Sequence, residues 1–415
     1  MTVDRRRFLQ GAAAAGTALG FPAIVSAQAN GPIRLGLLTV KTGPLASGGL
    51  DMERGLLMYM KEIGGSIAGR KVEVFVADSA ANPTTARSKV QELVEKNRVH
   101  ALAGPLAAFE ALAIDDYIRQ AQIPIMSVAA AEDMTQRKAN PWMVRASATS
   151  AQSSMPMADY CFKVLKWRRA VVAADDFAYG HEQTAGFQRV FEDLGGKVVQ
   201  RLYSPLAVPD YGSYLAQLKT NVDGVFFGYA GSNGFRFLRQ LNEYGLKGKF
   251  GLAGGHSSLD ESVLRNMGDE ALGVYTACPY SADLSNPINR RFVPVFRAEM
   301  KYDPGFYTMS TYVNGEIFKA AVEKINGKVE DKQALMKALR ATNVLTLRGP
   351  VRFDDFGNIV GDMYIRQVQR KEGKLVNAVI HTFPNVSQFW TYNPQEFLKN
   401  PVYSRDWPPA KNLEG

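Results

Sequence analysis

The chain has 415 residues, of which 46% are hydrophobic and 21% are charged, and this balance is typical of a soluble globular protein. Its formal net charge of +9 is modest for this length and its positive residues are scattered, so nucleic acid is not an expected partner. With four His and neither a CxxC nor an HExxH motif, the chain has no pattern for a metal site. Cys161 and Cys278 either form one disulfide or remain two buried thiols.

Residues 1–27 are predicted to be an export signal. Arg5, Arg6 and Arg7 precede Phe8 and Leu9, and a mildly apolar run and several small residues follow. This pattern is typical of a twin-arginine signal peptide. The apolar run is too short and too rich in Ala and Gly for a stable membrane span. We therefore expect the mature chain to be free in the periplasm.

Apolar runs alternate with helical patterns through the first part of the mature chain. The run at 33–40 is too densely apolar for a surface strand and suits a central strand of a parallel sheet. Thr42-Gly43-Pro44 ends this strand. The alternation of apolar strands with helices predicts a doubly wound parallel sheet, in which ligands bind beyond the carboxyl ends of the strands. Further strands are predicted at 71–77, 100–103 and 124–128, and helices at 50–63, 83–97 and 107–121.

A second α/β series begins at about residue 149, after a stretch of small polar residues. We assign 31–148 and 281–346 to a first lobe, 149–280 and 347–384 to a second lobe, and 385–415 to an irregular C-terminal tail. The second series has predicted strands at 169–174, 197–203, 222–229, 249–252 and 274–279, helices at 180–194, 233–244, 286–300 and 309–325, and a β-rich end at 347–382.

Several segments, taken in order, resemble one known family. They read LGLLTVKTGPLASGGLDMERGLLMYMKEIGGSIAGRKVEVFVADS, AGPLAAFEALAI, IPIMSVAAAED, VVAADDFAYGHEQTAGF, VFFGYAGSNGFRFLRQL and LRGPVRFDDFGN. The chain resembles the type I periplasmic solute-binding proteins of ABC importers, in the branched-chain amino acid group that includes the Leu/Ile/Val-binding proteins. The resemblance covers the mature chain and implies an α/β fold of two doubly wound parallel-sheet lobes joined by a multi-crossing hinge.

The resemblance also implies the function. The lobes would close on a small carboxylate ligand, an aromatic acid or a branched or hydrophobic amino acid, and deliver it to the membrane permease of an ABC importer. We expect a monomer that needs no cofactor and is not an enzyme. A periplasmic ligand sensor with the same fold is the alternative, and it would use the same cleft residues.

The ligand contacts of the family can be carried over by position. One of these regions has physical support of its own, because a helix starting near Ala107 presents free backbone N–H groups that suit a carboxylate. An ordinary capped helix start is the alternative there, and part of the aromatic set could belong to the core. The segments implied are 42–46, 106–109, 129–131, 177–179, 229–231 and 254–256. The residues singled out in them are Thr42, Leu45, Ala107, Ala108, Phe109, Ala129, Ala131, Phe177, Tyr179, Tyr229, Ala230, Gly231 and His256.

The chain departs from the amino-acid-binding pattern at three places. Ala108 and Ala131 stand where amino-acid binders of the family typically have Ser and Thr, and the turn Gly254-Gly255-His256 lacks their acidic residue. A buried ammonium group needs such a partner, whereas a carboxylate ligand without an amine does not. Aromatic and aliphatic acids are therefore candidates beside amino acids. His256 either donates to the ligand or lies solvated at the cleft rim.

Three acidic residues follow predicted strand ends, namely Asp78, Asp175 and Asp176. No nucleophile or metal-binding set accompanies them, so we expect helix caps or loop anchors rather than acid–base catalysts. GxGxxG is also absent, and with it the expected signature of dinucleotide binding.

Overall fold

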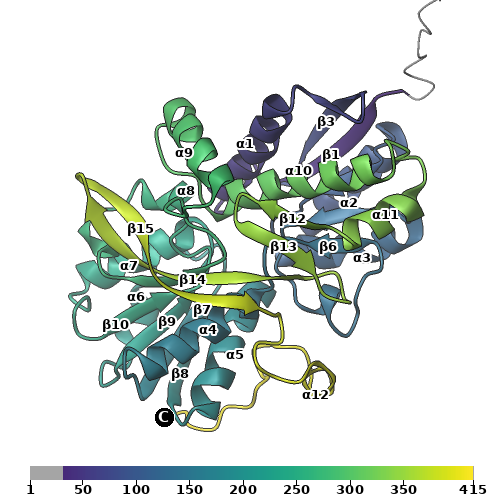
Figure 1. Cartoon of the computed structure of the whole chain (residues 1–415). Helices are drawn as coiled ribbons and strands as arrows, with labels where there is room; N and C mark the ends of the chain where they lie inside the picture. The colour runs from purple at the N-terminus through teal and green to yellow at the C-terminus, as the bar shows by residue number, and fades with distance from the viewer. Residues whose placement is uncertain (1–30, 415) are drawn as a thin grey trace, which may run out of the picture. The chain divides into compact units, whose positions relative to one another are not determined.

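The computed structural model describes residues 31–414, so the predicted export signal at 1–27 lies outside the described residues. Helices and strands alternate through most of the chain (Figure 1). The strands are β1 (Ile33–Thr39), β2 (Ser66–Ile67), β3 (Arg70–Asp78), β4 (Ala101–Ala103), β5 (Ile125–Ser127), β6 (Met143–Arg145), β7 (Arg169–Asp175), β8 (Lys197–Ser204), β9 (Gly224–Gly228), β10 (Gly251–Gly254), β11 (Tyr275–Cys278), β12 (Asn343–Thr346), β13 (Gly349–Phe353), β14 (Ile359–Lys371) and β15 (Lys374–Val386).

The helices cover the faces of two sheets. Within the described chain, none of them combines the length and the hydrophobicity needed to cross a lipid bilayer. They are α1 (Ala46–Glu62), α2 (Pro83–Gln91), α3 (Ala108–Ala121), α4 (Ser150–Lys163), α5 (Ala178–Asp193), α6 (Gly212–Ala216), α7 (Ser232–Glu243), α8 (Glu261–Leu264), α9 (Pro287–Met300), α10 (Phe306–Lys324), α11 (Lys332–Arg340) and α12 (Pro394–Leu398).

The first sheet has the strand order β2-β3-β1-β4-β5-β6. All its pairs are parallel except β2 with β3, and β1 lies between β3 and β4, with Leu35 opposite Val74 and Ala101. Parallel central strands are covered on both faces, which explains why β1 is a nearly continuous apolar run. Helices α1 and α10 pack together, as do α2 and α3, and both pairs contribute to the core of this lobe.

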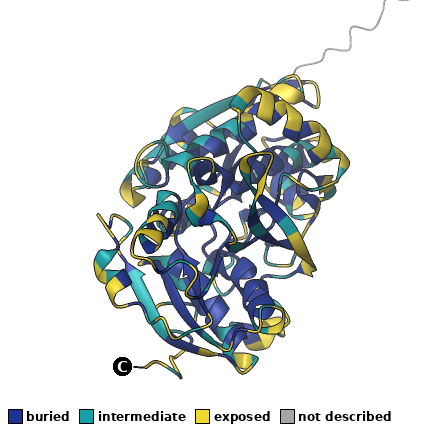
Figure 2. Ribbon diagram, turned by 90° about the vertical axis from the view of Figure 1, so that its left-hand side faces the viewer, coloured by how far each residue is buried: buried dark blue, intermediate teal, exposed yellow. Residues whose placement is uncertain are grey.

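The second sheet has the strand order β12-β13-β14-β11-β10-β9-β7-β8, with β15 paired to β14. Its strands from β7 to β11 are parallel, while β11, β13 and β15 each pair antiparallel with β14. Mostly buried residues form β7, β9, β10 and β11, whereas exposed residues lie on the outer helices and loops and on the edge strands β12 and β15 (Figure 2). The two-sheet α/β architecture of the type I periplasmic binding proteins is confirmed.

The chain passes between the two sheets more than once, and two of the crossing segments lie side by side. Arg145, at the end of β6, forms an isolated parallel bridge with Asn358 just before β14, and its backbone N–H donates to the carbonyl of Gly357 at 2.8 Å. The buried guanidinium of Arg348 also donates to the carbonyl of Ala146 at 2.7 Å. These contacts tie the crossing segments together.

The strands and helices predicted from the sequence are present, with ends displaced by a few residues. Helix α11 and the short strands β2 and β12 were not predicted, although Leu335, Met336 and Leu339 give α11 an apolar face. Cys161 and Cys278 are both free and buried. The predicted tail at 385–415 includes α12 and buries Phe397 against the second sheet's core, and the lobe boundaries remain a prediction.

Candidate ligand-binding site

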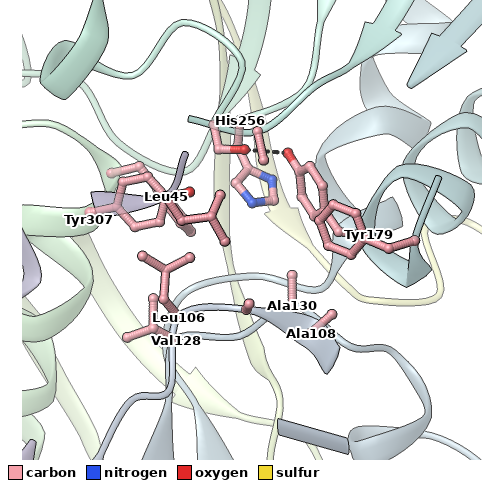
Figure 3. Close-up of a pocket in the computed structure, with 13 residues that line it drawn as sticks. Leu45, Leu106, Ala108, Val128, Ala130, Tyr179, His256 and Tyr307 are labelled. Atoms are coloured by element: carbon pink, nitrogen blue, oxygen red, sulfur yellow. Dashed lines mark hydrogen bonds between the residues drawn. The ribbon is translucent and has the colours of Figure 1, made fainter. Parts of the chain in front are cut away.

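A cavity that is partly open to solvent lies among the loops that connect the strands of the two sheets to their helices (Figure 3). Loops and helix starts that follow β1, β4 and β5 form part of its wall, and those that follow β7, β9 and β10 form another part. This is the edge at which a parallel sheet positions ligands. The lining residues are Leu45, Leu106, Ala107, Ala108, Val128, Ala130, Phe177, Tyr179, Ala230, His256, Ser257, Phe306 and Tyr307.

Five α-helices of the described chain begin at this cavity, and none of the five has a side chain that caps its first turn. Their N-cap residues are Leu45, Ala107, Phe177, Gly231 and Gly305, for α1, α3, α5, α7 and α10. Six helices that do not line the cavity are capped by a side-chain oxygen, and the five-residue α6 neither lines the cavity nor has such a cap. The capping residues are Asn82, Thr149, Asp260, Asn286, Asp331 and Asn393.

Two of the five helix ends receive an acceptor from elsewhere in the chain. The carbonyl of Pro44 accepts from the N–H of Ser232, the first residue of α7, at 3.2 Å, and the carboxylate of Asp260 accepts from the N–H of Phe306, the first residue of α10, at 2.6 Å. At the start of α1 the N–H of Ala46 donates to the carbonyl of Gly43 at 3.1 Å, whereas the rest of its first turn and the starts of α3 and α5 have no such acceptor from elsewhere in the described chain. Because the first N–H groups of an α-helix have no partner within it, these ends present donors and a partial positive charge to the cavity.

The polar side chains of the cavity are neutral donors and acceptors. The hydroxyls of Tyr179 and Ser257 are 2.6 Å apart. Burial, followed by the charges of Arg366 and Arg348, lowers the pKa of His256 to about 3, so this ring is uncharged at neutral pH.

Hydrogen bonds outside the cavity orient the ring of His256. Nδ1 lies 2.9 Å from Oγ of Ser153 and 3.2 Å from Nε2 of Gln183. The amide nitrogen of Gln183 can only donate, so Nδ1 accepts and the ring proton is on Nε2. The ring also packs against Phe306 and Tyr179, with centroids 4.5 and 5.4 Å away. His256 is therefore a fixed neutral donor, and the prediction of a solvated rim position is wrong because the residue is 2% exposed.

Among the described residues that line the cavity there is no Asp, Glu, Lys or Arg. Glu110, considered as an alternative acceptor for an ammonium group, instead accepts from the N–H of Ala107 at 3.0 Å and from Ser79. Asp176, the other alternative, lies 2.7 Å from Nε2 of His181 and also accepts from Arg405. The cavity thus combines positive helix ends with neutral side chains.

Seven predicted site residues line the cavity, and six do not. The ring of Tyr229 is fully buried in the second lobe's core against Tyr211 and Phe237, at 5.2 and 4.7 Å between centroids. The seven are Leu45, Ala107, Ala108, Phe177, Tyr179, Ala230 and His256, and the six are Thr42, Phe109, Ala129, Ala131, Tyr229 and Gly231.

In the loop after β5 the predicted contact segment is right, but the residues singled out in it are the wrong ones. Ala130 lines the cavity, whereas the carbonyls of Ala129 and Ala131 on either side of it accept from the guanidinium of Arg145. Phe109 packs its ring against Phe177 at 5.6 Å instead of lining the cavity itself. A loop has no periodic pattern in its sequence from which the inward-facing residue could be read.

Sequence reasoning also missed contributions from residues distant in the chain. Phe306 and Tyr307 come from the start of α10, which follows the last strand of the parallel series and returns to the first lobe. Their only local signal is two aromatic residues directly after Gly305. Val128 and Ser257 also lie outside the predicted contact segments, whereas Leu106 and Ala130 lie inside them but were not singled out.

The acidic residues that follow strand ends are loop anchors, as predicted. Asp78 accepts from the N–H groups of Lys41 and Ala80, at 2.9 and 2.8 Å. Asp175 accepts from the N–H of Ala230 at 2.8 Å and from Nδ2 of Asn233 at 2.7 Å, and burial raises the pKa of this carboxyl to about 7. Residues 31–414 contain no group of His, Cys, Asp and Glu side chains that could hold a metal ion.

Known proteins share this architecture and between a quarter and a third of the aligned sequence. A solute-binding protein of an ABC transporter from Rhodopseudomonas palustris BisB5, solved with 3,4-dihydroxybenzoic acid, is 32% identical with a TM-score of 0.82, over 86% of this chain and 98% of that chain. One from strain HaA2, solved with p-hydroxybenzoic acid, is 26% identical with a TM-score of 0.81, over 86% and 98%.

A Leu/Ile/Val-binding protein homolog from Brucella abortus is 29% identical over 85% of this chain and 91% of its own length. The family model described as periplasmic binding protein matches residues 32–374, which is most of the chain. Since the match spans both sheets and the cavity between them, the chain belongs to the periplasmic binding protein family.

Proposed function

We propose that this protein binds a small carboxylate that lacks an ammonium group. The observation that carries the proposal is the contrast at the cavity between uncapped helix ends and an uncharged lining. Three free helix starts suit an anion. An α-ammonium group would have no carboxylate to meet it, and leaving a buried charge unpaired is costly.

The carboxylate is an aromatic one. The rings of Phe177, Tyr179, Phe306 and Tyr307 line the cavity together with aliphatic side chains, and such rings favour stacked or edge contacts with a ligand ring. The hydroxyls of Tyr179 and Ser257 and the Nε2–H of His256 can bond a ring substituent. The two relatives solved with hydroxybenzoic acids support this choice.

The role of the protein is capture of this acid for an ABC importer. Two relatives are named as solute-binding proteins of ABC transporters, which supports a membrane permease as the partner and argues against enzymatic activity. Membership of the periplasmic binding protein family supports a periplasmic location. The protein acts as a monomer, with the hinge segments allowing the lobes to close on the ligand.

The test compares acids with their α-amino counterparts. Thermal-shift and calorimetric titrations would use benzoate, 4-hydroxybenzoate, 3,4-dihydroxybenzoate, 3-phenylpropionate and 4-methylpentanoate, with phenylalanine and leucine as the matched amino acids. A ligand at a hundred times its Kd adds about 2.7 kcal/mol to stability, so binding is visible as a higher melting temperature. We expect the deaminated acid of each pair to bind at least about a hundredfold more tightly.

Tighter binding of leucine or phenylalanine than of the matched acid would overturn the proposal. Conversion of a bound acid into a product would overturn the non-enzymatic role. Benzoate serves as the reference for the hydroxybenzoates, because it has the same ring and carboxylate without a hydroxyl.

A further inference from the structure

The two lobes meet directly at a backbone contact beside the cavity. Pro44 lies in the loop between β1 and α1, and its carbonyl oxygen accepts from the backbone N–H of Ser232 at 3.2 Å and from the Ser232 hydroxyl at 3.4 Å. Ser232 is the first residue of α7 in the second lobe. Pro44 therefore supplies, from the opposite lobe, an acceptor for the first N–H group of α7.

Gly231 is what allows the lobes to approach this closely. Its φ is +55°, and a Cβ added at this position would lie 2.4 Å from the carbonyl oxygen of Pro44. The neighbouring atom belongs to the backbone, so it cannot rotate away as the end of a flexible side chain could. A residue larger than glycine would have to push Pro44 and α7 apart.

The contact borders the cavity on both sides. Leu45 directly follows Pro44 and lines the cavity from the first lobe, while Ala230 directly precedes Gly231 and lines it from the second lobe. Separation of Pro44 from Ser232 would move these two wall residues apart. The distance between the walls is therefore coupled to this one contact.

We propose that Pro44, Gly231 and Ser232 form a latch that holds the lobes closed and positions Leu45 and Ala230 around the ligand. The latch rests on the proposed function, since it is measured through the affinity for a carboxylate. The three latch residues would act as positioning residues, which affect binding without having to touch the ligand.

The first test replaces the glycine. Gly231→Ala is compared with Gly245→Ala, because Gly245 follows the other end of α7, has a φ of +65°, and has nothing within 4 Å of an added Cβ. Both variants place an L residue at positive φ, but the ψ of −133° puts Gly231 outside the left-handed helical region and makes its replacement the more strained of the two. The Ser232 variants below therefore test the contact with the opposite lobe without that strain. We expect Gly231→Ala to weaken binding at least about tenfold and Gly245→Ala by less than about twofold.

The second test removes the hydrogen-bond donors. Proline is well tolerated at the first position of a helix, so Ser232→Pro leaves α7 intact. It eliminates both the N–H and the hydroxyl that reach Pro44, and its ring Cδ takes the place of the N–H hydrogen against the Pro44 carbonyl, which also drives the two segments apart. Ser232→Ala eliminates only the hydroxyl. At roughly 2–10-fold in affinity for each bond, Ser232→Pro should weaken binding about tenfold and Ser232→Ala about twofold.

The measurements are calorimetric titration with the tightest of benzoate, 4-hydroxybenzoate and 3,4-dihydroxybenzoate, and solution scattering with and without that acid. The ligand-induced fall in radius of gyration should be smaller in Gly231→Ala and Ser232→Pro than in the wild type. Wild-type protein that binds none of the three acids overturns both proposals. Wild-type protein that binds, with both variants within about twofold of their controls, overturns the latch alone. If Gly231→Ala does not fold, the Ser232 pair decides the outcome.

Discussion

The helices that begin at the cavity differ from those that begin elsewhere in the residue before their first turn. Asn82, Asn286 and Asp331 each accept a hydrogen bond from the backbone of the helix that they precede, whereas Leu45 and Ala107 at the cavity have no side-chain oxygen to offer. A side-chain cap contributes about 1 kcal/mol to stability. The protein therefore lacks this stabilisation at the helix ends where free donors can meet a ligand.

The largest effect should come from placing a negative charge at an uncapped end. Ala108 is the first residue of α3 and lines the cavity, so Ala108→Asp would occupy the helix donors and repel a carboxylate. We expect at least about a hundredfold loss of affinity without a lower melting temperature of the unliganded protein. Titration calorimetry measures the first and thermal unfolding the second.

Ala108→Asn is the matched control, because it has nearly the same shape and no charge. It should weaken binding much less than Ala108→Asp. Equal losses in the two variants would mean that bulk at this position, not charge, decides binding, and the free helix ends would then have no special role in recognising the acid.

The neutral state of the cavity can be tested through His256. Because burial lowers the pKa of His256 from its usual 6.5 to about 3, the unfolded chain binds a proton between these values that the folded chain does not. Stability is then fully present above pH 6.5 and is lost as pH falls below it. Between pH 7 and pH 5 the wild type should lose about 2 kcal/mol more than His256→Gln.

Urea unfolding of both proteins at pH 7 and pH 5 measures this difference. Several buried carboxyls, including Glu132 and Glu316, have pKa values raised by burial and change stability in the opposite direction, so only the difference between the two proteins is informative. Parallel pH profiles would show that the ring is charged or exposed in the folded state.

A smaller effect is expected from removing a cap far from the cavity. Asn82 accepts from the N–H of Thr85 at 3.0 Å at the start of α2, so Asn82→Ala should cost about 1 kcal/mol of stability. Affinity for the acid should remain within about twofold, because α2 does not line the cavity. Chemical unfolding measures the loss of stability, and calorimetric titration measures the affinity. A clear change in affinity would mean that helix ends away from the cavity also influence binding.

The smallest effect should come from the opposite change, the addition of a side-chain cap to a helix that begins at the cavity. Ala107 has the extended conformation of a capping residue, with φ −92° and ψ 146°, and Glu110 already accepts from its N–H. Ala107→Ser would complete a capping box, with a gain of roughly 0.5–1 kcal/mol in stability. It should also weaken binding a few-fold, because the new hydroxyl competes with the ligand for a helix N–H. A gain in both stability and affinity would contradict the view that the uncapped helix ends at the cavity keep their N–H groups free for the ligand.

Much of the fold could be predicted because its signals are local. The apolar run of β1, its abrupt end at Thr42-Gly43-Pro44 and the alternation of strand and helix follow from hydrophobic periodicity and turn chemistry within a few residues. Since ligands bind beyond the carboxyl ends of parallel strands, the regions around Leu45, Ala107 and Phe177 could be placed at a cleft from the amino-acid sequence and its family resemblance.

Only the tertiary structure decided which side chains face the cavity. Tyr179 and Tyr229 both lie close to the ends of strands in the second lobe, yet the first lines the cavity and the second packs against Tyr211. Ala130 rather than its neighbours points inward, and Phe306 arrives from a helix far along the chain. The spacing of apolar residues along a helix or strand shows which of its faces packs against its own sheet. The lining of a cavity between two lobes depends on how separate elements meet, and that is determined by packing over long distances in sequence.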